Sequence, residues 1–169
     1  MKNMTIKNLD KLIFAVSYHD IDKFHMFVRD FKNNPETFNE YAGFLCERIK
    51  LEKDFTDSFD CFVFVPSADA ERTNYSHKLA LFLSEKLGKP VNPSLLKKIR
   101  ATKELKTLPR EERRKEIEDS FSAALSGGER LCIVDDVKAS GATLGEISKA
   151  LKEAGASYVC AVVVAVYNP

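Results

Sequence analysis

The chain has 169 residues, with 26 Lys and Arg side chains against 25 Asp and Glu, so its formal net charge is +1. This balance argues against a protein that binds nucleic acid through a global positive field. Its hydrophobic content of 44% suits one globular domain, and its longest apolar run, 159–167, is about half of a membrane span. No secretory signal is visible and the four cysteines are scattered, so we expect a cytoplasmic protein without a cysteine metal site.

The first third of the chain predicts a strand followed by two helices. The apolar run 12–18 is typical of a strand, or of a strand-like segment that leads into the fold. Residues 20–33 then carry Ile, Phe and Val at helical spacing, which predicts an amphipathic helix. Pro35 lies where the first turn of a second helix would begin, and that helix extends to Ile49.

The rest of the chain alternates short apolar runs with amphipathic stretches. We predict strands at 61–65, 131–134 and 158–166, and helices at 76–87 and 143–154. The stretch 91–99 is ambiguous, and the charged stretch 101–118 indicates an exposed loop that enters a helix near Pro109. The alternation predicts an α/β fold, a parallel twisted sheet with helices on both faces. Ligands in such folds bind beyond the carboxyl ends of the strands.

Polar residues follow the apolar run 131–134. Asp135 and Asp136 come first, and two carboxylates there cost desolvation free energy unless they meet hydroxyls, cations or backbone donors. A short turn with Ser140 and Gly141 then opens a helix, whose first N–H groups suit a phosphate. The segment therefore offers acceptors for sugar hydroxyls and donors for a phosphate, as a phosphorylated pentose requires. An alternative is that Asp136 and Ser140 only cap the helix, which explains one polar residue but not the whole pattern.

The sequence of residues 131–144, Leu-Cys-Ile-Val-Asp-Asp-Val-Lys-Ala-Ser-Gly-Ala-Thr-Leu, resembles a known motif. It is similar to the segment with which type I phosphoribosyltransferases bind 5-phosphoribosyl 1-pyrophosphate (PRPP). Four further positions match the spaced pattern of the ComF-like branch of that family: Thr102, Leu108, Arg113 and Phe121. Leu105 and Glu116 depart from the pattern, and the zinc-binding cysteine module that often precedes this family is absent from the sequence.

The resemblance implies a type I phosphoribosyltransferase-like fold with a small N-terminal helical hood. Residues 1–55 would form the hood segment, and 56–169 the PRPP-binding core of the same domain. The implied activity is transfer of phosphoribose to or from a nitrogenous base, with pyrophosphate as co-product and Mg²⁺ as cofactor. The partners would be PRPP and a nucleobase-like molecule, and homodimers are common among similar enzymes.

The resemblance also implies roles for individual residues. Asp135 and Asp136 would hold the ribose hydroxyls, and Arg72 would contact the pyrophosphate as a third catalytic candidate. Mg²⁺ would be held through PRPP, with the two aspartates as candidate additional ligands. The implied 5-phosphate loop is Lys138, Ala139, Ser140, Gly141, Ala142 and Thr143, with Ala139 where the family usually has Thr. The implied pyrophosphate loop is Pro66, Ser67, Ala68 and Arg72.

The stretch 97–115 contains nine basic and three acidic residues. Such a stretch is often a solvated surface, and its alternative role is a mobile lid over the pyrophosphate, with Arg100 and Arg113 as lid candidates. No aromatic residues interleave there, so direct contact with nucleic acid is not favoured.

Two other functions remain open from the sequence. A non-catalytic sensor of PRPP or a nucleotide would keep the sugar-phosphate site and regulate a partner. A ComF-like accessory role in DNA uptake or utilisation rests on the resemblance alone. The sequence does not specify the acceptor base.

Overall fold

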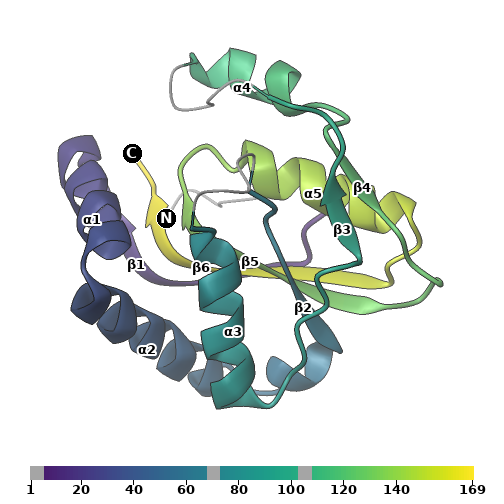
Figure 1. Cartoon of the computed structure of the whole chain (residues 1–169), viewed down its shortest axis with the longest axis horizontal. Coiled ribbons are helices and arrows are strands. Elements are labelled where there is room, and N and C mark those ends of the chain that lie inside the picture. Colours follow the sequence, from purple (N-terminus) through teal and green to yellow (C-terminus); the bar gives the residue numbers. More distant parts are fainter. Residues whose placement is uncertain (1–5, 68–72, 103–107) are drawn as a thin grey trace.

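The computed structural model describes residues 6–67, 73–102 and 108–169, except for the side chains of Arg110 and Glu111. Helices and strands alternate along these residues (Figure 1). Their bounds are β1 (Lys11–Tyr18), α1 (Ile21–Asn33), α2 (Pro35–Leu51), the 3-10 turn η1 (Thr56–Ser58), β2 (Cys61–Phe64), α3 (Tyr75–Leu87), β3 (Leu96–Lys98), α4 (Arg110–Ile117), β4 (Phe121–Ala123), β5 (Arg130–Lys138), α5 (Ala142–Glu153) and β6 (Tyr158–Tyr167).

The centre of the fold is a parallel sheet. Within the described residues it has four strands in the order β1-β6-β5-β2, and every pair is parallel. A single parallel bridge between Phe62 and Val91 extends the sheet beyond β2. The start of the ambiguous stretch 91–99 therefore pairs with the sheet. All carboxyl ends of the strands therefore meet at one edge of the sheet, which we call the carboxyl edge.

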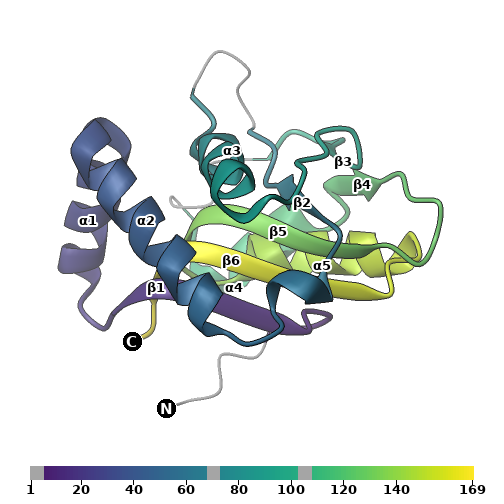
Figure 2. The same cartoon turned by 90° about the horizontal axis from the view of Figure 1, so that it is seen from below.

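Helices cover both faces of this sheet. Helices α1, α2 and α3 lie on one face and α5 lies on the other (Figures 1 and 2). Alternate residues of β6 join the two cores: Cys160, Val162 and Val164 pack towards α1, α2 and α3, whereas Val159, Ala161 and Val163 pack towards α5. Burial on both faces explains why the strand is apolar without interruption, and the predicted α/β architecture is confirmed.

Capping side chains fix the ends of the hood helices. The carboxylate of Asp20 accepts a hydrogen bond from the backbone N–H of Lys23 at 2.9 Å, which starts α1 as an Asp N-cap does. Asn34 ends α1 and also caps α2 by accepting from the N–H of Glu36 at 3.0 Å, with Pro35 at the first helical position. The connection between α1 and α2 is therefore tight, and the last turn of α1 has a defined position.

The N-terminal segment is divided between the sheet and the hood. β1, which falls in the predicted hood segment 1–55, pairs with β6 from Lys11 to Tyr18 and so forms part of the central sheet. Only α1, α2 and the short η1 follow it in that segment or at its border. None of the helices in the described parts of the chain has the length and apolarity needed to cross a membrane.

A small antiparallel arm interrupts the α/β alternation between α3 and β5. β3 pairs with β4, and α4 lies between them in the sequence and above α5 in Figure 1. The buried side chains of Ile117 and Phe121 join the core on the α5 side of the sheet. The helix predicted near Pro109 is present, whereas β3 and β4 are each three residues long, too short for a recognisable alternation.

Candidate functional site

The acid pair lies inside a strand and not beyond its end. The sequence predicted that this strand ends at Val134, but β5 continues to Lys138 because β6 keeps pairing with it, from Asp135 opposite Val163 to Lys138 opposite Val166. Asp135 is 9% exposed and Asp136 is 8% exposed. The two carboxyl groups are thus held by a rigid, buried element at the carboxyl edge.

Asp135 is fixed by hydrogen bonds from two sides. Its Oδ1 accepts from the Ser76 hydroxyl at 2.9 Å and from the backbone N–H of Asp136 at 2.9 Å. Burial, and next the neighbouring charge and hydrogen bond of Asp136, raise the pKa of the Asp135 carboxyl well above its usual range. Proximity to a second carboxylate in a buried place favours the protonated form of Asp135.

Asp136 forms an ion pair with a lysine of the hood. Its Oδ2 lies 2.5 Å from the ammonium of Lys32, in the last turn of α1, and its Oδ1 accepts from the N–H of Val137 at 2.8 Å. Burial alone would lower the pKa of Lys32, but the charge and hydrogen bond of Asp136 hold that pKa above its ordinary value. The carboxylate therefore has a cation partner and does not cap α5.

The first turn of α3 completes this cluster. The Tyr75 hydroxyl donates to the carbonyl of Lys32, and the Lys32 ammonium lies 5.7 Å from the centre of the Tyr75 ring. Ser76 follows directly and contacts Asp135. The hood, α3 and β5 thus meet at five polar side chains, which we call the acid-pair cluster: Lys32, Tyr75, Ser76, Asp135 and Asp136.

The turn after β5 contains Gly141, the residue at which the sequence predicts a close backbone approach. Gly141 has φ +79°, a left-handed conformation that residues other than glycine rarely adopt, and as the N-cap residue of α5 it has no side chain of its own to cap the helix. A Cβ at Gly141 would lie 3.2 Å from Cε of Lys138. Ser140 accepts from the N–H of Ala142 at 3.3 Å, so it contributes to the helix start as the capping alternative held. The remaining N–H groups of this first turn have no intrahelical partner, which is the usual basis of a phosphate site.

Ile6 packs behind this turn. The side chain is 9% exposed, and its carbon atoms would be 3.5 Å from a Cβ at Gly141 and 3.6 Å from one at Gly145. Sequence reasoning did not find this residue, because nothing local relates the start of the chain to the motif. Ile6 gives the turn an apolar support on the α5 side of the sheet.

The segment after β2 starts and ends beside the acid-pair cluster. The N–H of Val65 donates to the carbonyl of Val134 at 3.1 Å, and the Asn74 amide donates back to the Val65 carbonyl at 3.0 Å. Asn74 also caps α3 by accepting from the N–H of His77 at 3.0 Å. Of the implied pyrophosphate loop, Pro66 and Ser67 lie in this segment, whereas Ala68 and Arg72 are outside the described residues.

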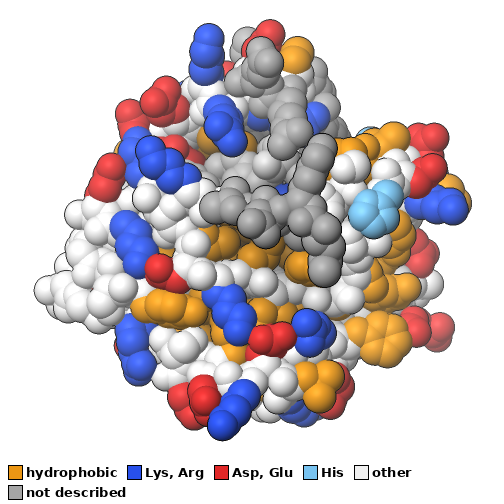
Figure 3. Space-filling model, turned by 180° about the vertical axis from the view of Figure 1, so that it is seen from behind, with side chains coloured by type: hydrophobic (Ala, Val, Ile, Leu, Met, Phe, Trp, Pro, Cys, Tyr) orange, Lys and Arg blue, Asp and Glu red, His pale blue; other side chains and the backbone are white. Residues whose placement is uncertain are grey.

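The two lid candidates contact their own segment. Arg100 donates to the carbonyls of Glu116 and Glu118 at 2.6 and 2.8 Å, which holds the end of α4, and Arg113 donates to the carbonyl of Leu108 at 2.9 Å. These contacts stabilise the arm around α4, and a role over the pyrophosphate stays a prediction. On the face drawn in Figure 3, basic and acidic side chains are interspersed and form no single basic patch.

The candidate ligands for a magnesium ion are few. No group of three or more His, Cys, Asp or Glu side chains within the described ranges is placed to hold a metal ion. Mg²⁺ in phosphate sites is commonly held by one or two carboxylates together with substrate phosphates, and Asp135 and Asp136 fit that smaller requirement. Of the implied 5-phosphate loop, Lys138 is the last residue of β5 and is buried, Ala139 lies in the turn, and Thr143 lies in the first turn of α5.

Sequence reasoning missed three members of the acid-pair cluster. Ser76 and Tyr75 gave a weak signal, because polar residues at the start of a helix that follows a buried strand lie at the carboxyl edge. Lys32 gave none, since a lysine in the last turn of an amphipathic helix is usually solvated. Only the packing of α1 against the sheet brings it to Asp136.

The fold and site define an α/β protein with a candidate sugar-phosphate site at the carboxyl edge of its sheet. No family model matches the chain. Competence protein F of Haemophilus influenzae is 35% identical over 86 residues, which cover 48% of this chain and 38% of that protein. The chain therefore spans well under half the length of this relative, and the similarity supports the ComF-like resemblance over about half of the chain.

The chain is also similar to two solved structures at low sequence identity. Adenine phosphoribosyltransferase of Leishmania donovani is 16% identical with a TM-score of 0.48, over 82% of this chain and 68% of that one. The protein TT1426 of Thermus thermophilus is 16% identical with a TM-score of 0.43, over 76% of this chain and 82% of that one.

Proposed function

We propose that the carboxyl edge around β5 binds PRPP with Mg²⁺, and that the protein transfers phosphoribose to or from a nitrogenous base with pyrophosphate as co-product. The observation that carries this proposal is the order of groups along one short segment. A buried pair of carboxyl groups, Asp135 and Asp136, is followed within a few residues by a left-handed glycine that opens a helix.

The acid pair suits the sugar. Oxygens of a carboxyl group accept hydrogen bonds, most strongly when the group is ionised, and vicinal ribose hydroxyls would donate one each to Asp135 and Asp136. Because both residues belong to β5, their spacing is set by a rigid strand and not by a loop. Two acceptors fixed side by side favour a diol over a single hydroxyl.

The turn suits the phosphate. The N–H groups from Ser140 to Thr143, the hydroxyls of those two residues and the positive end of the α5 dipole would all face a 5-phosphate. Gly141 lets the backbone approach closely, and Ile6 and Lys138 leave little room for a side chain there. Phosphate and diol would thus be recognised by neighbouring parts of the same segment.

In the proposed reaction the nitrogen lone pair of the acceptor forms a bond to C1 of the ribose. The bond between C1 and the pyrophosphate oxygen breaks, pyrophosphate leaves with that electron pair, and the acceptor nitrogen releases its proton to solvent. Positive charge develops on the ribose ring, and the charge of Asp136 would stabilise it in a partly dry site. Bound Mg²⁺ would neutralise charge on the leaving pyrophosphate.

Binding is the first test. We expect calorimetry to show that PRPP with Mg²⁺ binds the wild-type protein, and that Asp136→Asn weakens this affinity by about 10- to 100-fold, because a charge-assisted hydrogen bond is lost. Asn can still accept from Lys32, so the fold should survive. Asp60 directly precedes β2 and pairs with Arg130 at the start of β5, so Asp60→Asn is the matched control and should bind PRPP as the wild type does. Equal affinity in all three proteins would contradict the proposed site.

Catalysis requires a separate measurement. Release of pyrophosphate from PRPP in the presence of a panel of nucleobases would identify a transferase. A non-catalytic PRPP sensor is the second candidate, favoured by the exposed Ala139, which offers no hydroxyl to the phosphate. Binding of PRPP without pyrophosphate release on any base would select the sensor.

A role in DNA handling has less support from this chain. The name of competence protein F concerns that protein, of which this chain spans 38%. In the basic stretch, Arg100 binds the carbonyls at the end of α4 and Lys98 donates to the Thr102 hydroxyl at 2.6 Å. These contacts use the side chains that a DNA backbone would need.

A further inference from the structure

We infer that Lys32 determines ligand specificity at the proposed site by exchanging Asp136 for an anionic oxygen that the ligand carries on the C1 side of its ribose. This inference rests on the proposed function and adds a residue and a ligand requirement to it. The ligand class is a phosphorylated pentose with an anionic substituent at or near C1.

The first step is that Lys32 and a sugar compete for the same oxygen. The Oδ1 of Asp136 accepts from the N–H of Val137, and its Oδ2 is 2.5 Å from the Lys32 ammonium. A ribose hydroxyl that donates to Oδ2 takes part of the contact that Lys32 now makes. Sugar binding therefore weakens the ion pair, unless the ammonium finds another acceptor.

The second step is that Lys32 cannot withdraw freely into solvent. Its side chain is 37% exposed, so most of it is covered. The Tyr75 hydroxyl holds its backbone carbonyl, and the Tyr75 ring lies under its ammonium. These contacts keep the charge beside the acid pair after the Asp136 contact is weakened.

The third step is that the cluster offers Lys32 no second ion-pair partner. Within the described residues its ammonium pairs with Asp136, and Oδ1 of Asp135 already accepts from the Ser76 hydroxyl and from the N–H of Asp136. A partly buried cation that loses its counter-charge is strongly disfavoured. The ligand that displaces Lys32 from Asp136 must therefore bring the replacement charge itself.

The position of Lys32 suggests where that charge lies. The 5-phosphate would be held at the other end of the site, at the start of α5. Lys32 approaches Asp136 from the hood, next to the start of α3 and the segment that follows β2. The replacement anion would thus belong to the C1 side, either as the pyrophosphate of PRPP or as a carboxylate on the base of a nucleotide.

The test compares four ligands on three proteins. Calorimetry with Mg²⁺ would measure PRPP, ribose 5-phosphate, adenosine 5-monophosphate and orotidine 5-monophosphate, whose base carries a carboxylate. Lys32→Met removes the charge and keeps the length of the side chain. Lys23→Met, on the exposed face of the same helix, is the matched control, and Lys32→Arg restores the charge if Lys32→Met is poorly folded.

We expect Lys32→Met to weaken the affinity for PRPP at least tenfold. The affinity of this variant for ribose 5-phosphate should be unchanged or higher, because Lys32 no longer competes with the ribose hydroxyl for Asp136. Lys23→Met should change neither affinity, and Lys32→Arg should keep the preference for PRPP over ribose 5-phosphate. If Lys32→Met weakens the affinity for orotidine monophosphate and not that for PRPP, the anion that replaces Asp136 beside Lys32 is the carboxylate of the base. Equal changes for all four ligands in Lys32→Met, or loss of the PRPP preference in Lys32→Arg, would overturn the inference and leave the proposed function standing. A wild-type protein that binds none of the four would instead overturn the proposed function.

Discussion

The two ends of β5 carry similar charges in opposite surroundings. At its start, Arg130 lies 2.5 Å from the carboxylate of Asp60 and donates to the carbonyl of Asp57 at 3.0 Å. The side chain of Arg130 is 45% exposed and that of Asp60 is 51% exposed. At its far end, the pair between Lys32 and Asp136 has the same 2.5 Å separation, but the aspartate is buried.

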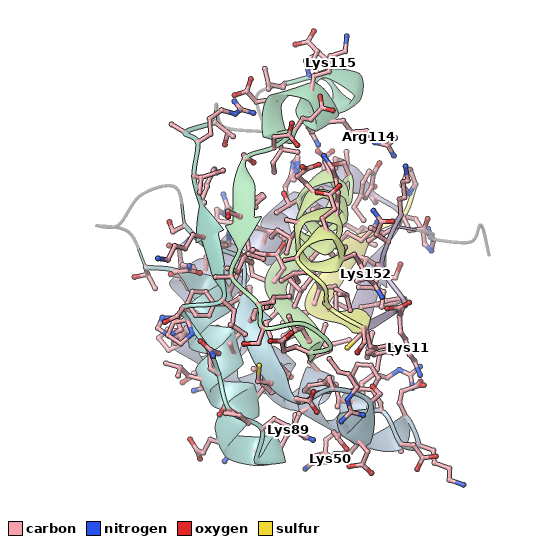
Figure 4. The ribbon with its side chains drawn as sticks, turned by 90° about the vertical axis from the view of Figure 1, so that its right-hand side faces the viewer. Lys11, Lys50, Lys89, Arg114, Lys115 and Lys152 are labelled. Carbon is pink, nitrogen blue, oxygen red and sulfur yellow. The ribbon has the colours of Figure 1, made fainter. Side chains whose placement is uncertain are left out.

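The two pairs differ in what their charges cost the folded protein in desolvation free energy. Figure 4 looks on to the edge where the strands begin, with Lys11, Lys89 and Lys152 projecting around it. Pairs at that edge are screened by water and contribute little to the free energy of unfolding. Burial of Asp135 and Asp136 costs desolvation free energy, and such a cost is commonly retained where function requires it.

The largest effect is expected from alanine substitution of two left-handed glycines, which lie at opposite edges of the sheet. Gly141 (φ +79°) opens α5 at the carboxyl edge, and Gly88 (φ +69°) closes α3 at the other. Alanine at either position should cost about 1–2 kcal/mol in the free energy of unfolding, because the left-handed conformation is strained for a residue with a Cβ. We expect only Gly141→Ala to weaken PRPP binding as well, by about 10-fold or more.

Denaturant unfolding and calorimetry on both variants provide the measurement. The room around Gly88 is open, whereas a Cβ at Gly141 approaches Lys138. If Gly88→Ala weakened PRPP binding as much as Gly141→Ala, the contrast between the two edges would be lost.

The next effect concerns the stability cost of Asp135. We expect Asp135→Asn to stabilise the free protein while it weakens sugar binding, because an amide oxygen can still accept from Ser76 and from the N–H of Asp136 without a buried charge. The folded-state pKa of Asp135 lies above its ordinary 3.8, so the wild type loses stability as pH rises from about 4 towards that raised pKa. The advantage of the variant should be small near pH 4 and reach about 1 kcal/mol or more at neutral pH.

Urea unfolding of both proteins across this pH range would measure that difference. An advantage that shrinks as pH rises would have the wrong sign for a carboxyl group whose pKa is raised by folding.

The smallest effect is expected at the exposed end of β5. Asp60→Asn removes a carboxylate whose pKa is lowered by hydrogen bonds from Arg130, but the pair is open to solvent. We expect the melting temperature to fall by less than about 3 °C, and the difference from wild type to shrink in high salt. A large fall that salt does not change would mean that the two ends of the strand are energetically alike.

Local patterns in the sequence predicted most of the sheet and its helices. The apolar runs at 131–134 and 158–166 lie inside β5 and β6, because strands covered on both faces are apolar throughout. The sequence predicted a close backbone approach at Gly141, but not the left-handed conformation of this residue. In contrast, the extension of β5 through Asp135 depends on pairing with β6, and periodicity alone does not show such pairing.

The long-range contacts of the site were not predictable. Lys32, Tyr75 and Asp136 are far apart in the sequence and come together only when α1 and α3 pack on the same face of the sheet. Ile6 reaches the turn at Gly141 in the same way, from the start of the chain. The ligand-binding groups that the sequence indicates therefore stay a prediction, and the sequence did not reveal the residues that contact those groups from other elements.

A crystal structure of the protein with PRPP and Mg²⁺ would test the central claim most directly. We expect the 5-phosphate within hydrogen-bond distance of the N–H groups from Ser140 to Thr143, and two ribose hydroxyls on Asp135 and Asp136. PRPP bound elsewhere, with the pair between Lys32 and Asp136 intact and the turn at Gly141 empty, would contradict the account.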